Sequence, residues 1–348
     1  MPTQPWDIHE HDFPRTAPRR EQLAFLVEYA VLAPSTYNTQ PWRFVLEEDA
    51  VQLYADPDRM LPGLDPDGRE LWMSCGAALF HLRIAAHHYG YAPVIRTWPD
   101  GGEDNHIATI RLGPACEPTL RQEHLFSAIQ KRRTVRDDFD DRPVSGSEVE
   151  RLIRAADREG ADLVAASRSD RPYLAEWSVE AGRVLATDPA VRKEWAAWGA
   201  VDPDRDDGVP RTSRHLGVLR THTAPFLVRL PGGFTRVAAE SSERIEAAPC
   251  IVVLATRQDD RPAWLDAGQA LDRVLLQATA FGLAASFINH PLKVDWIRDQ
   301  VAERLCPGRF PQAILRIGVP ADRSDATPRR PAGSVTETVD TADDPLYP

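Results

Sequence analysis

The sequence predicts an α+β fold built from two related halves. Residues 75–90 align without gaps on residues 267–282, and both segments have the small-residue spacing and closing glycine of a tightly packed helix. A strand-like segment follows each helix, at 108–113 and 313–318. Chance similarity between alanine-rich helices is the alternative, but the same helix-then-strand order in both halves favours an internal duplication. The identical pairs, all offset by 192 residues, are Gly76 and Gly268, Ala78 and Ala270, Leu79 and Leu271, Ala86 and Ala278, and Gly90 and Gly282.

The first half contains one further helix and a hairpin. Residues 21–32 are apolar nearly all round, as in a buried helix, and Pro34 ends the pattern. Residues 42–46 and 51–55 are strand-like and flank an acidic turn at 47–49, which predicts a pair of antiparallel strands. We therefore expect this half to run helix, hairpin, helix, strand.

The second half carries matching signals. Ser145 and Glu148 have the spacing of a capping box, so a helix is expected to begin there. Residues 250–255 and 283–288 are short apolar segments on either side of the repeated helix, which predicts two buried strands. The apolar stripe of the helix after the capping box is expected at Val149, Leu152, Ile153 and Ala156.

We place the two halves at residues 1–120 and 121–348. Between residues 199 and 240 the periodicity is lost in favour of an Asp-Pro-Asp turn, a basic stretch and a Pro-Gly-Gly sequence. A long insertion of this kind is typical of a lid, a binding loop or disorder. The tail after Pro320 is also irregular.

The composition limits the class of partner. Asp and Glu total 52 against 41 Lys and Arg, and the formal charge of −11 disfavours nucleic acid and anionic membranes as partners. The four cysteines lie far apart without a Cys-x-x-Cys pair, so neither a zinc site nor a disulfide framework is indicated. The sequence has no signal-peptide pattern and no apolar run of membrane-spanning length, and a cytoplasmic protein is expected.

Residues 33–42 leave the first helix and enter the first strand through a polar turn. Two prolines restrict its shape, while Ser35, Asn38 and Gln40 offer donors and acceptors that suit the edge of a planar polar ligand. An ordinary helix-to-strand connection has the same composition, which taken alone favours that second interpretation.

Residues 131–136 carry four cations and one hydroxyl group, that of Thr134, in an otherwise acidic chain. Guanidinium groups bind phosphate through paired, charge-assisted hydrogen bonds, so this run is a candidate anion site. A solvated basic turn is the alternative, and residue type alone does not separate the two.

Together these two segments resemble the flavin-binding signatures of the FMN-dependent nitroreductase family, in its fused, pseudo-dimeric Acg-like branch. The family's Ala-Pro-Ser-x-x-Asn-x-Gln-Pro-Trp loop is matched from residue 33 to 42, and its basic run precedes a phenylalanine and a proline-led helix, as the run precedes Phe139 and Pro143 here. The resemblance implies a nitroreductase-like fold with FMN bound between the halves. The residues that it assigns to FMN in these segments are Arg132, Arg133, Thr134, Arg136, Pro34, Ser35, Asn38 and Gln40.

The placement of the two signatures implies a single FMN site within one chain. Ordinary members of the family are homodimers that build each flavin site across their interface. Here the loop lies in the first half and the basic run in the second, while the symmetry-related site lacks both signatures and is expected to be inactive. Because the pocket needs no second chain, a monomer and a further oligomer are both compatible with the sequence.

Two further segments extend the resemblance. Asn289 and His290 follow the second repeated helix and its strand, where the family presents a backbone amide to flavin N5, although the family often has glycine there. The tail segment 328–331, Pro-Arg-Arg-Pro, is similar to the C-terminal basic element that reaches the FMN phosphate. Arg329 or Arg330 is expected in that role.

The implied activity is that of an oxidoreductase that takes hydride from NAD(P)H and passes electrons to a small acceptor, a nitro compound or a quinone. The alternative is a non-catalytic protein that stores FMN beneath a lid. Neither reading requires a protein nucleophile or a metal. Three tryptophans are expected to pack in the protein rather than against flavin: Trp177, Trp195 and Trp198.

Overall fold

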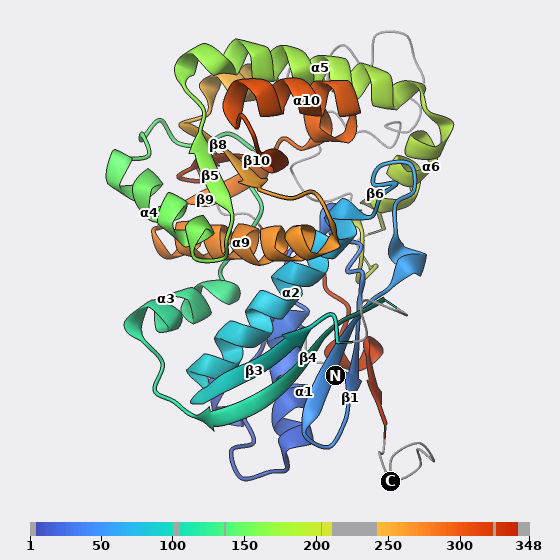
Figure 1. Cartoon of the computed structure of the whole chain (residues 1–348), viewed down its shortest axis with the longest axis vertical. Helices are drawn as coiled ribbons and strands as arrows, with labels where there is room; N and C mark the ends of the chain where they lie inside the picture. Colours follow the sequence, from blue (N-terminus) through green and yellow to red (C-terminus); the bar gives the residue numbers. More distant parts are fainter. Residues whose placement is uncertain are drawn as a thin grey trace.

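The chain folds into two sheet-and-helix units that lie one above the other (Figure 1). They meet where α2 (Arg69–His88) packs against α9 (Arg261–Ala280). These two helices contain the repeated segments, and Gly90 and Gly282 after them have φ of 90° and 74°, the left-handed conformation expected of closing glycines. The computed structural model describes residues 5–99, 105–135, 137–202, 204–210, 242–322 and 325–339.

The first sheet has the strand order β11-β1-β2-β4-β3. The hairpin expected from the sequence is β1 (Trp42–Leu46) and β2 (Ala50–Ala55), and β4 (His106–Ala115) and β3 (Tyr91–Thr97) continue the sheet, all antiparallel to their neighbours. The short β11 (Thr336–Thr338) pairs with β1 in parallel. The tail of the chain therefore completes the sheet of the first half.

The second sheet repeats the order of the first. Its strands β5 (Asp162–Ala165), β8 (Cys250–Thr256), β10 (Phe310–Gly318) and β9 (Ala284–Phe287) lie in the order β5-β8-β10-β9 and are all antiparallel. As α2 lies between β2 and β3 in the chain, α9 lies between β8 and β9. The two halves therefore share strand order and connectivity, as a duplication predicts, while common ancestry of the halves stays an inference.

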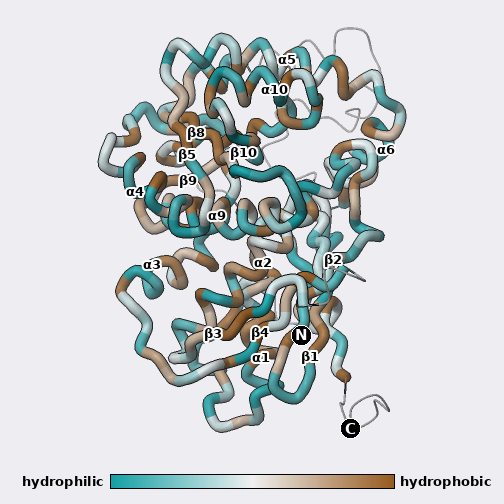
Figure 2. The backbone as a smooth tube through the Cα atoms, viewed as in Figure 1, coloured by the Kyte–Doolittle hydropathy of each residue, from teal (hydrophilic) through white to brown (hydrophobic). Residues whose placement is uncertain are grey.

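The other helices cover the sheets. α1 (Arg19–Ala30) and α3 (Leu120–Ile129) pack against α2, and α4 (Gly146–Asp157) packs against α9. α5 (Arg171–Thr187) and α10 (Asp295–Leu305) cover the face of the second sheet opposite α9. Figure 2 shows hydrophobic stretches along the strands of both halves, where alternate residues face these helices.

The capping box predicted at the start of α4 forms. The Ser145 side chain accepts a hydrogen bond from the Glu148 amide, and α4 begins at Gly146. The expected apolar stripe of α4 was wrong at one position. Ile153 is 36% exposed, and Ala155 is buried in its place because it faces α9.

The expected boundary at residue 120 is crossed twice by packing. Leu125, Phe126 and Ile129 of α3 belong to the hydrophobic core of the first half, and β11 belongs to its sheet. The division into residues 1–120 and 121–348 therefore stays a proposal about repeats in the sequence and does not describe two independent cores.

The expected insertion at 199–240 is described only at its beginning. After α6 (Pro189–Trp198), β6 (Gly199–Val201) pairs in parallel with β7 (Val209–Pro210). The proposed lid, with its basic stretch and Pro-Gly-Gly sequence, falls on residues 211–241 and lies outside the described residues.

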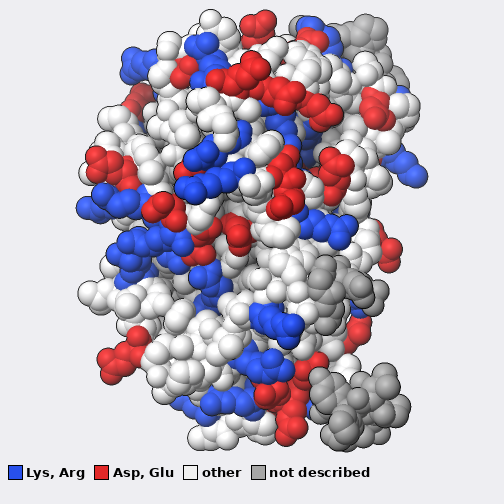
Figure 3. Space-filling model, viewed as in Figure 1, with Lys and Arg blue, Asp and Glu red and all other residues white. Residues whose placement is uncertain are grey.

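The surface carries both signs of charge. On the face drawn in Figure 3, acidic and basic side chains are interspersed rather than gathered into one field. Of the helices in the described ranges, none combines the length and apolar character needed to span a bilayer.

The contact between α2 and α9 depends on two glycines at matching positions. A Cβ on Gly76 would overlap the carbonyl oxygen of Leu265, and a Cβ on Gly268 would overlap that of Met73. Backbone atoms therefore meet directly across this crossing, which a side chain at either position would prevent.

A buried ion pair lies in the same contact. His81 of α2 places Nε2 2.9 Å from a carboxylate oxygen of Asp272 of α9, and both side chains are fully buried. The other ring nitrogen, Nδ1, lies 2.8 Å from the carbonyl oxygen of Tyr29, which can only accept. Nδ1 therefore donates to this carbonyl oxygen, which fixes the orientation of the ring in the contact between α2 and α9.

Replacing Gly268 with alanine is expected to lower the free energy of unfolding by about 1–3 kcal/mol, the usual cost of overpacking a core. The added methyl group overlaps the backbone around Met73, which moves only if α2 moves. Gly146→Ala is the matched control, because a Cβ at the first residue of α4 meets no atom within 4 Å. Urea unfolding followed by circular dichroism compares the two variants, and equal midpoints would contradict the proposed close contact.

Candidate functional site

The polar loop at residues 33–42 has an unusual backbone. Tyr37, Asn38 and Gln40 have φ of 49°, 56° and 50°, a region that side chains other than glycine rarely adopt. Ser35 helps to hold this conformation, since its Oγ accepts a hydrogen bond from the Gln40 amide at 2.9 Å. Strained backbone persists only where the surroundings fix it, and such positions are concentrated at functional sites.

The loop binds the C-terminal tail and the start of the insertion. The Asn38 Oδ1 accepts from the guanidinium of Arg329 at 2.9 Å, and its Nδ2 donates to the carbonyl oxygen of Gly208 at 3.0 Å. The Gln40 Oε1 accepts from the backbone amide of Arg330 at 2.8 Å. Both side chains expected to contact a ligand bind protein groups in this structure, and these contacts hold the tail against the loop.

Three arginines from two distant segments lie close together, and two of them stack on Trp6. Arg133 and Arg329 place their guanidinium carbons 4.4 and 5.1 Å from the centre of the Trp6 ring. Arg132 is 4% exposed and donates to the Thr134 hydroxyl at 3.3 Å. We call Arg132, Arg133 and Arg329 the arginine cluster.

Arg329 is unfavourably placed for a charged group. Burial lowers the pKa of its guanidinium well below the usual range, and the positive charges of Arg132 and Arg133 lower it further. Among the described residues it forms no ion pair, and its Nε is buried without a hydrogen-bond partner. Its other nitrogens reach only neutral oxygens, such as that of Asn38. A nearby anion would stabilise a buried charge in this state, and a phosphate group has the charge and acceptors to do so.

The neighbouring Arg330 lies in a different environment. It is half-buried, and burial and then the charge of Arg59 lower the pKa of its guanidinium, whereas Asp56 and Asp207 raise it. Its guanidinium donates to the carbonyl oxygen of Gln40 at 3.4 Å. The sequence left Arg329 and Arg330 open as the residue that binds an anion. Arg329 lies within the cluster of cations, whereas Arg330 lies beside carboxylates, so Arg329 is the better candidate.

The basic run lies against the end of the second sheet. Thr134 forms an isolated parallel bridge with Ala285 of β9, and the Val135 amide donates to the Ala285 carbonyl oxygen at 3.0 Å. The run is thereby placed next to the strand that leads to Asn289 and His290. The remaining expected residue of the run, Arg136, lies outside the described residues.

Asn289 and His290 end this strand and begin the short helix η6 (His290–Lys293). The Asn289 Oδ1 accepts from the amide of Ile314 on β10 at 3.0 Å, so this side chain fixes the strand end. Burial, and then the charge of Lys293, lower the pKa of His290 to about 4, against the opposite effect of Glu70. The imidazole is therefore neutral at pH 7.

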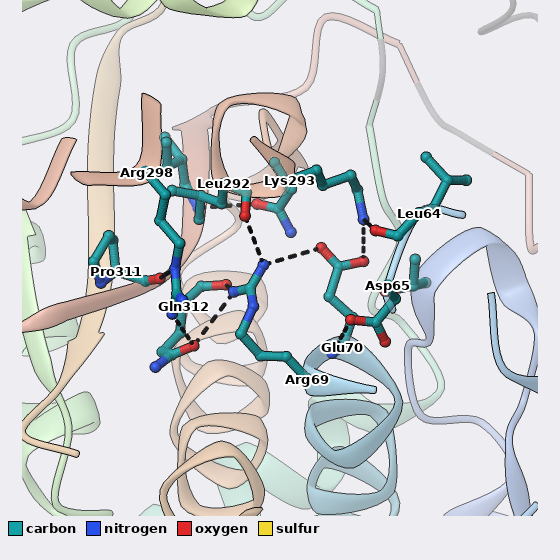
Figure 4. Close-up of polar contacts among 12 residues, drawn as sticks. Leu64, Asp65, Arg69, Glu70, Leu292, Lys293, Arg298, Pro311 and Gln312 are labelled. Atoms are coloured by element: carbon teal, nitrogen blue, oxygen red, sulfur yellow. Dashed lines mark hydrogen bonds and ion pairs between the residues drawn. The ribbon is translucent and has the colours of Figure 1, made fainter. Parts of the chain in front are cut away.

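A buried charge network connects α2 with η6 (Figure 4). Lys293 Nζ lies 2.6 Å from a carboxylate oxygen of Glu70, and both side chains are less than 5% exposed. Burial alone would raise the pKa of Glu70, but Lys293 and Arg69 hold it below its usual value, and the Thr36 hydroxyl contributes a hydrogen bond. Glu70 thus joins the loop of the first half to η6 of the second.

Sequence reasoning identified the four segments at 33–42, 131–136, 289–290 and 328–331 but missed several of their partners. At one end of the candidate site the structure brings Arg132, Arg133 and Arg329 together. At the other end it connects the loop with η6. Trp6, Glu70 and Lys293 were not expected in the site. Of these three residues, Lys293 alone stood out in the sequence, because the chain has only three lysines. Trp195 was expected to pack, and it does, but against Tyr37 of the loop and His290.

Comparison with known proteins places the chain in a family. The nitroreductase family model matches residues 129–318. In Mycobacterium tuberculosis strain H37Rv, "Putative NAD(P)H nitroreductase Rv3131" is 35% identical over 330 residues, or 92% of each chain. "Putative NAD(P)H nitroreductase acg" of the same strain is 31% identical over 332 residues, which cover 92% of this chain and 97% of the relative. The chain belongs to the nitroreductase family.

Proposed function

We propose that the chain binds one FMN between its two halves and uses it as an NAD(P)H-dependent oxidoreductase. The observation that carries this proposal is the arginine cluster, in which the buried Arg329 has no anionic partner among the described residues. An FMN phosphate brings close to two negative charges and accepts the paired hydrogen bonds that guanidinium groups donate. FMN also fits the family to which the chain belongs.

In this proposal each part of the site has a separate task. Arg132, Arg133 and Arg329 hold the phosphate, with Thr134 beside them, and Arg136 serves the pyrimidine edge of the flavin. Asn38 and Gln40 keep the tail against the loop, so that Arg329 stays in the cluster. Pro34 and Ser35, in the same loop, are also proposed to lie at the flavin.

The backbone at Asn289 and His290 is proposed to face flavin N5, the atom at which bound FMN exchanges hydride. The neutral His290 ring adds no positive charge at this position. The curated relatives' names support NAD(P)H as the reductant. A small nitro compound or quinone is the proposed acceptor.

The second candidate function is storage of FMN. Its support is that the start of the insertion is attached to the same loop: Gln40 Nε2 donates to the carbonyl oxygen of Asp206 at 2.8 Å, and the Gly208 amide donates to that of Asn38 at 3.2 Å. A segment fastened there is in position to cover a flavin. Storage requires binding without reaction, so measurements of reduction separate the two functions.

Replacing Arg329 with methionine is expected to weaken FMN binding by about 1.5–3 kcal/mol, the range for a hydrogen bond to a charged group. Fluorescence titration of the apoprotein measures this loss. Arg330→Met is expected to lose less, because Arg330 lies beside carboxylates, and Arg154→Met on the exposed face of α4 is the control. Equal losses at Arg329 and Arg330 would contradict the assignment to Arg329.

The purified chain is expected to carry one FMN per polypeptide, because the loop at 33–42 and the run at 131–136 each occur once. Release of the flavin, its identification by chromatography and comparison with protein concentration give this ratio. A ratio of two would show that the symmetry-related site also binds flavin. FAD in place of FMN would show that the phosphate assignment is wrong.

Anaerobic mixing with NADH or NADPH is expected to bleach the flavin, and a quinone or nitroarene is expected to restore its absorbance. Hydride transfer needs the nicotinamide within about 3–3.5 Å of N5, so bleaching requires an accessible flavin. Dithionite serves as the control that the flavin is reducible. A protein that keeps its FMN and is bleached by dithionite but by neither nucleotide is a storage protein.

A further inference from the structure

Trp195 contacts both segments that border the proposed site, the loop at residues 33–42 and η6, which we call the two walls. Its Nε1 donates a hydrogen bond to the Tyr37 hydroxyl at 2.8 Å, and its ring meets that of His290 edge to face, with centroids 6.4 Å apart. Tyr37 belongs to the loop of the first half, and His290 begins η6 of the second half. One side chain therefore reaches from one wall to the other.

The backbone that carries Trp195 is firmly anchored. The preceding residue, Glu194, accepts hydrogen bonds from the amides of Gly63 at 2.7 Å and Leu64 at 2.9 Å. A Cβ on Gly63 would come within 2.8 Å of the Val191 amide nitrogen, so α6 lies directly on this segment. The Trp195 side chain can therefore change its rotamer while the backbone of α6 stays in place.

The end of α6 is held as well. The guanidinium carbons of Arg59 and Arg205 lie 5.8 and 5.6 Å from the centre of the Trp198 ring. Arg59 also donates to the carbonyl oxygen of Thr39 in the loop at 2.6 Å. The helix is therefore fixed relative to the loop on which Tyr37 lies.

The same two walls are also joined by Glu70, but in a different way. Its contacts with Thr36 and Lys293 are buried, and breaking a buried ion pair leaves an uncompensated charge. Trp195 is partly exposed, and its link to Tyr37 is one neutral hydrogen bond, whose net contribution is small. The Trp195 link is therefore the one that opens at low cost.

We propose that Trp195 is a specificity-determining residue of this site, whose indole ring controls which reductants and acceptors reach the flavin. The inference rests on the proposed function, since it places the flavin between the loop and the start of η6. A planar nicotinamide must lie against the flavin and needs the space that the indole crosses, whereas a small reductant needs less. The ring therefore restricts large reactants more than small ones.

The test compares a large and a small reductant on the FMN-loaded protein. Anaerobic stopped-flow measurements give the rate of flavin bleaching by NADPH, by NADH and by dithionite, and the quantity compared is the nucleotide rate divided by the dithionite rate. Trp195→Ala is expected to raise this ratio roughly tenfold or more, which corresponds to about 1.4 kcal/mol less barrier for the nucleotide. Tyr37→Phe, which removes the acceptor but keeps the ring, is expected to raise it less.

Trp296→Ala is the matched control, because this tryptophan lies on α10 and is 48% exposed. It is expected to keep the ratio of the unchanged protein. A Trp195→Ala protein that retains FMN but keeps that ratio would overturn the inference alone. Loss of FMN from this variant would also overturn it, since Trp195 would then be a flavin ligand. Unchanged protein that binds no FMN at all would overturn the proposed function itself.

Discussion

The direct backbone contact between α2 and α9 is the constraint on which the rest of the structure depends. Gly76 and Gly268 remove the side chains that would separate the two helices, and the buried pair of His81 and Asp272 lies in the same contact. Because both helices precede a strand of their own sheet, this contact fixes the two sheets relative to each other. The N-terminal end of α2 is thereby held against η6, where Glu70 meets Lys293.

The arginine cluster shows how electrostatics connects this arrangement to ligand binding. Burying Arg329 beside Arg132 and Arg133 opposes folding, because desolvation and like-charge repulsion both disfavour the charged form. The contacts of Asn38 and Gln40 with the tail hold Arg329 there nonetheless. Binding of an anion would offset that penalty, so in our proposal the FMN phosphate stabilises the folded chain as well as occupying the site.

The two connections across the site differ in strength, and this difference bears on both candidate functions. The buried pair of Glu70 and Lys293 keeps the walls at a fixed separation, while the partly exposed Trp195 touches both walls through weak contacts. In our proposal, access to the flavin therefore depends on the Trp195 side chain rather than on movement of the halves. An oxidoreductase requires that access, and a storage protein must prevent it.

The sequence by itself determined the local elements and the segments that carry the chemistry. The capping box at Ser145, the hairpin strands and the repeated helices depend on neighbouring residues, and the loop and the basic run were recognised as motifs. Only the tertiary structure decided which residues meet. Arg329 and Arg330 are equivalent as sequence, and the crossing of the tail to β1 places one among cations and the other beside carboxylates. Trp195 looked like a packing residue for the same reason: its partners Tyr37 and His290 are distant in the chain, and no local pattern encodes contacts between distant segments.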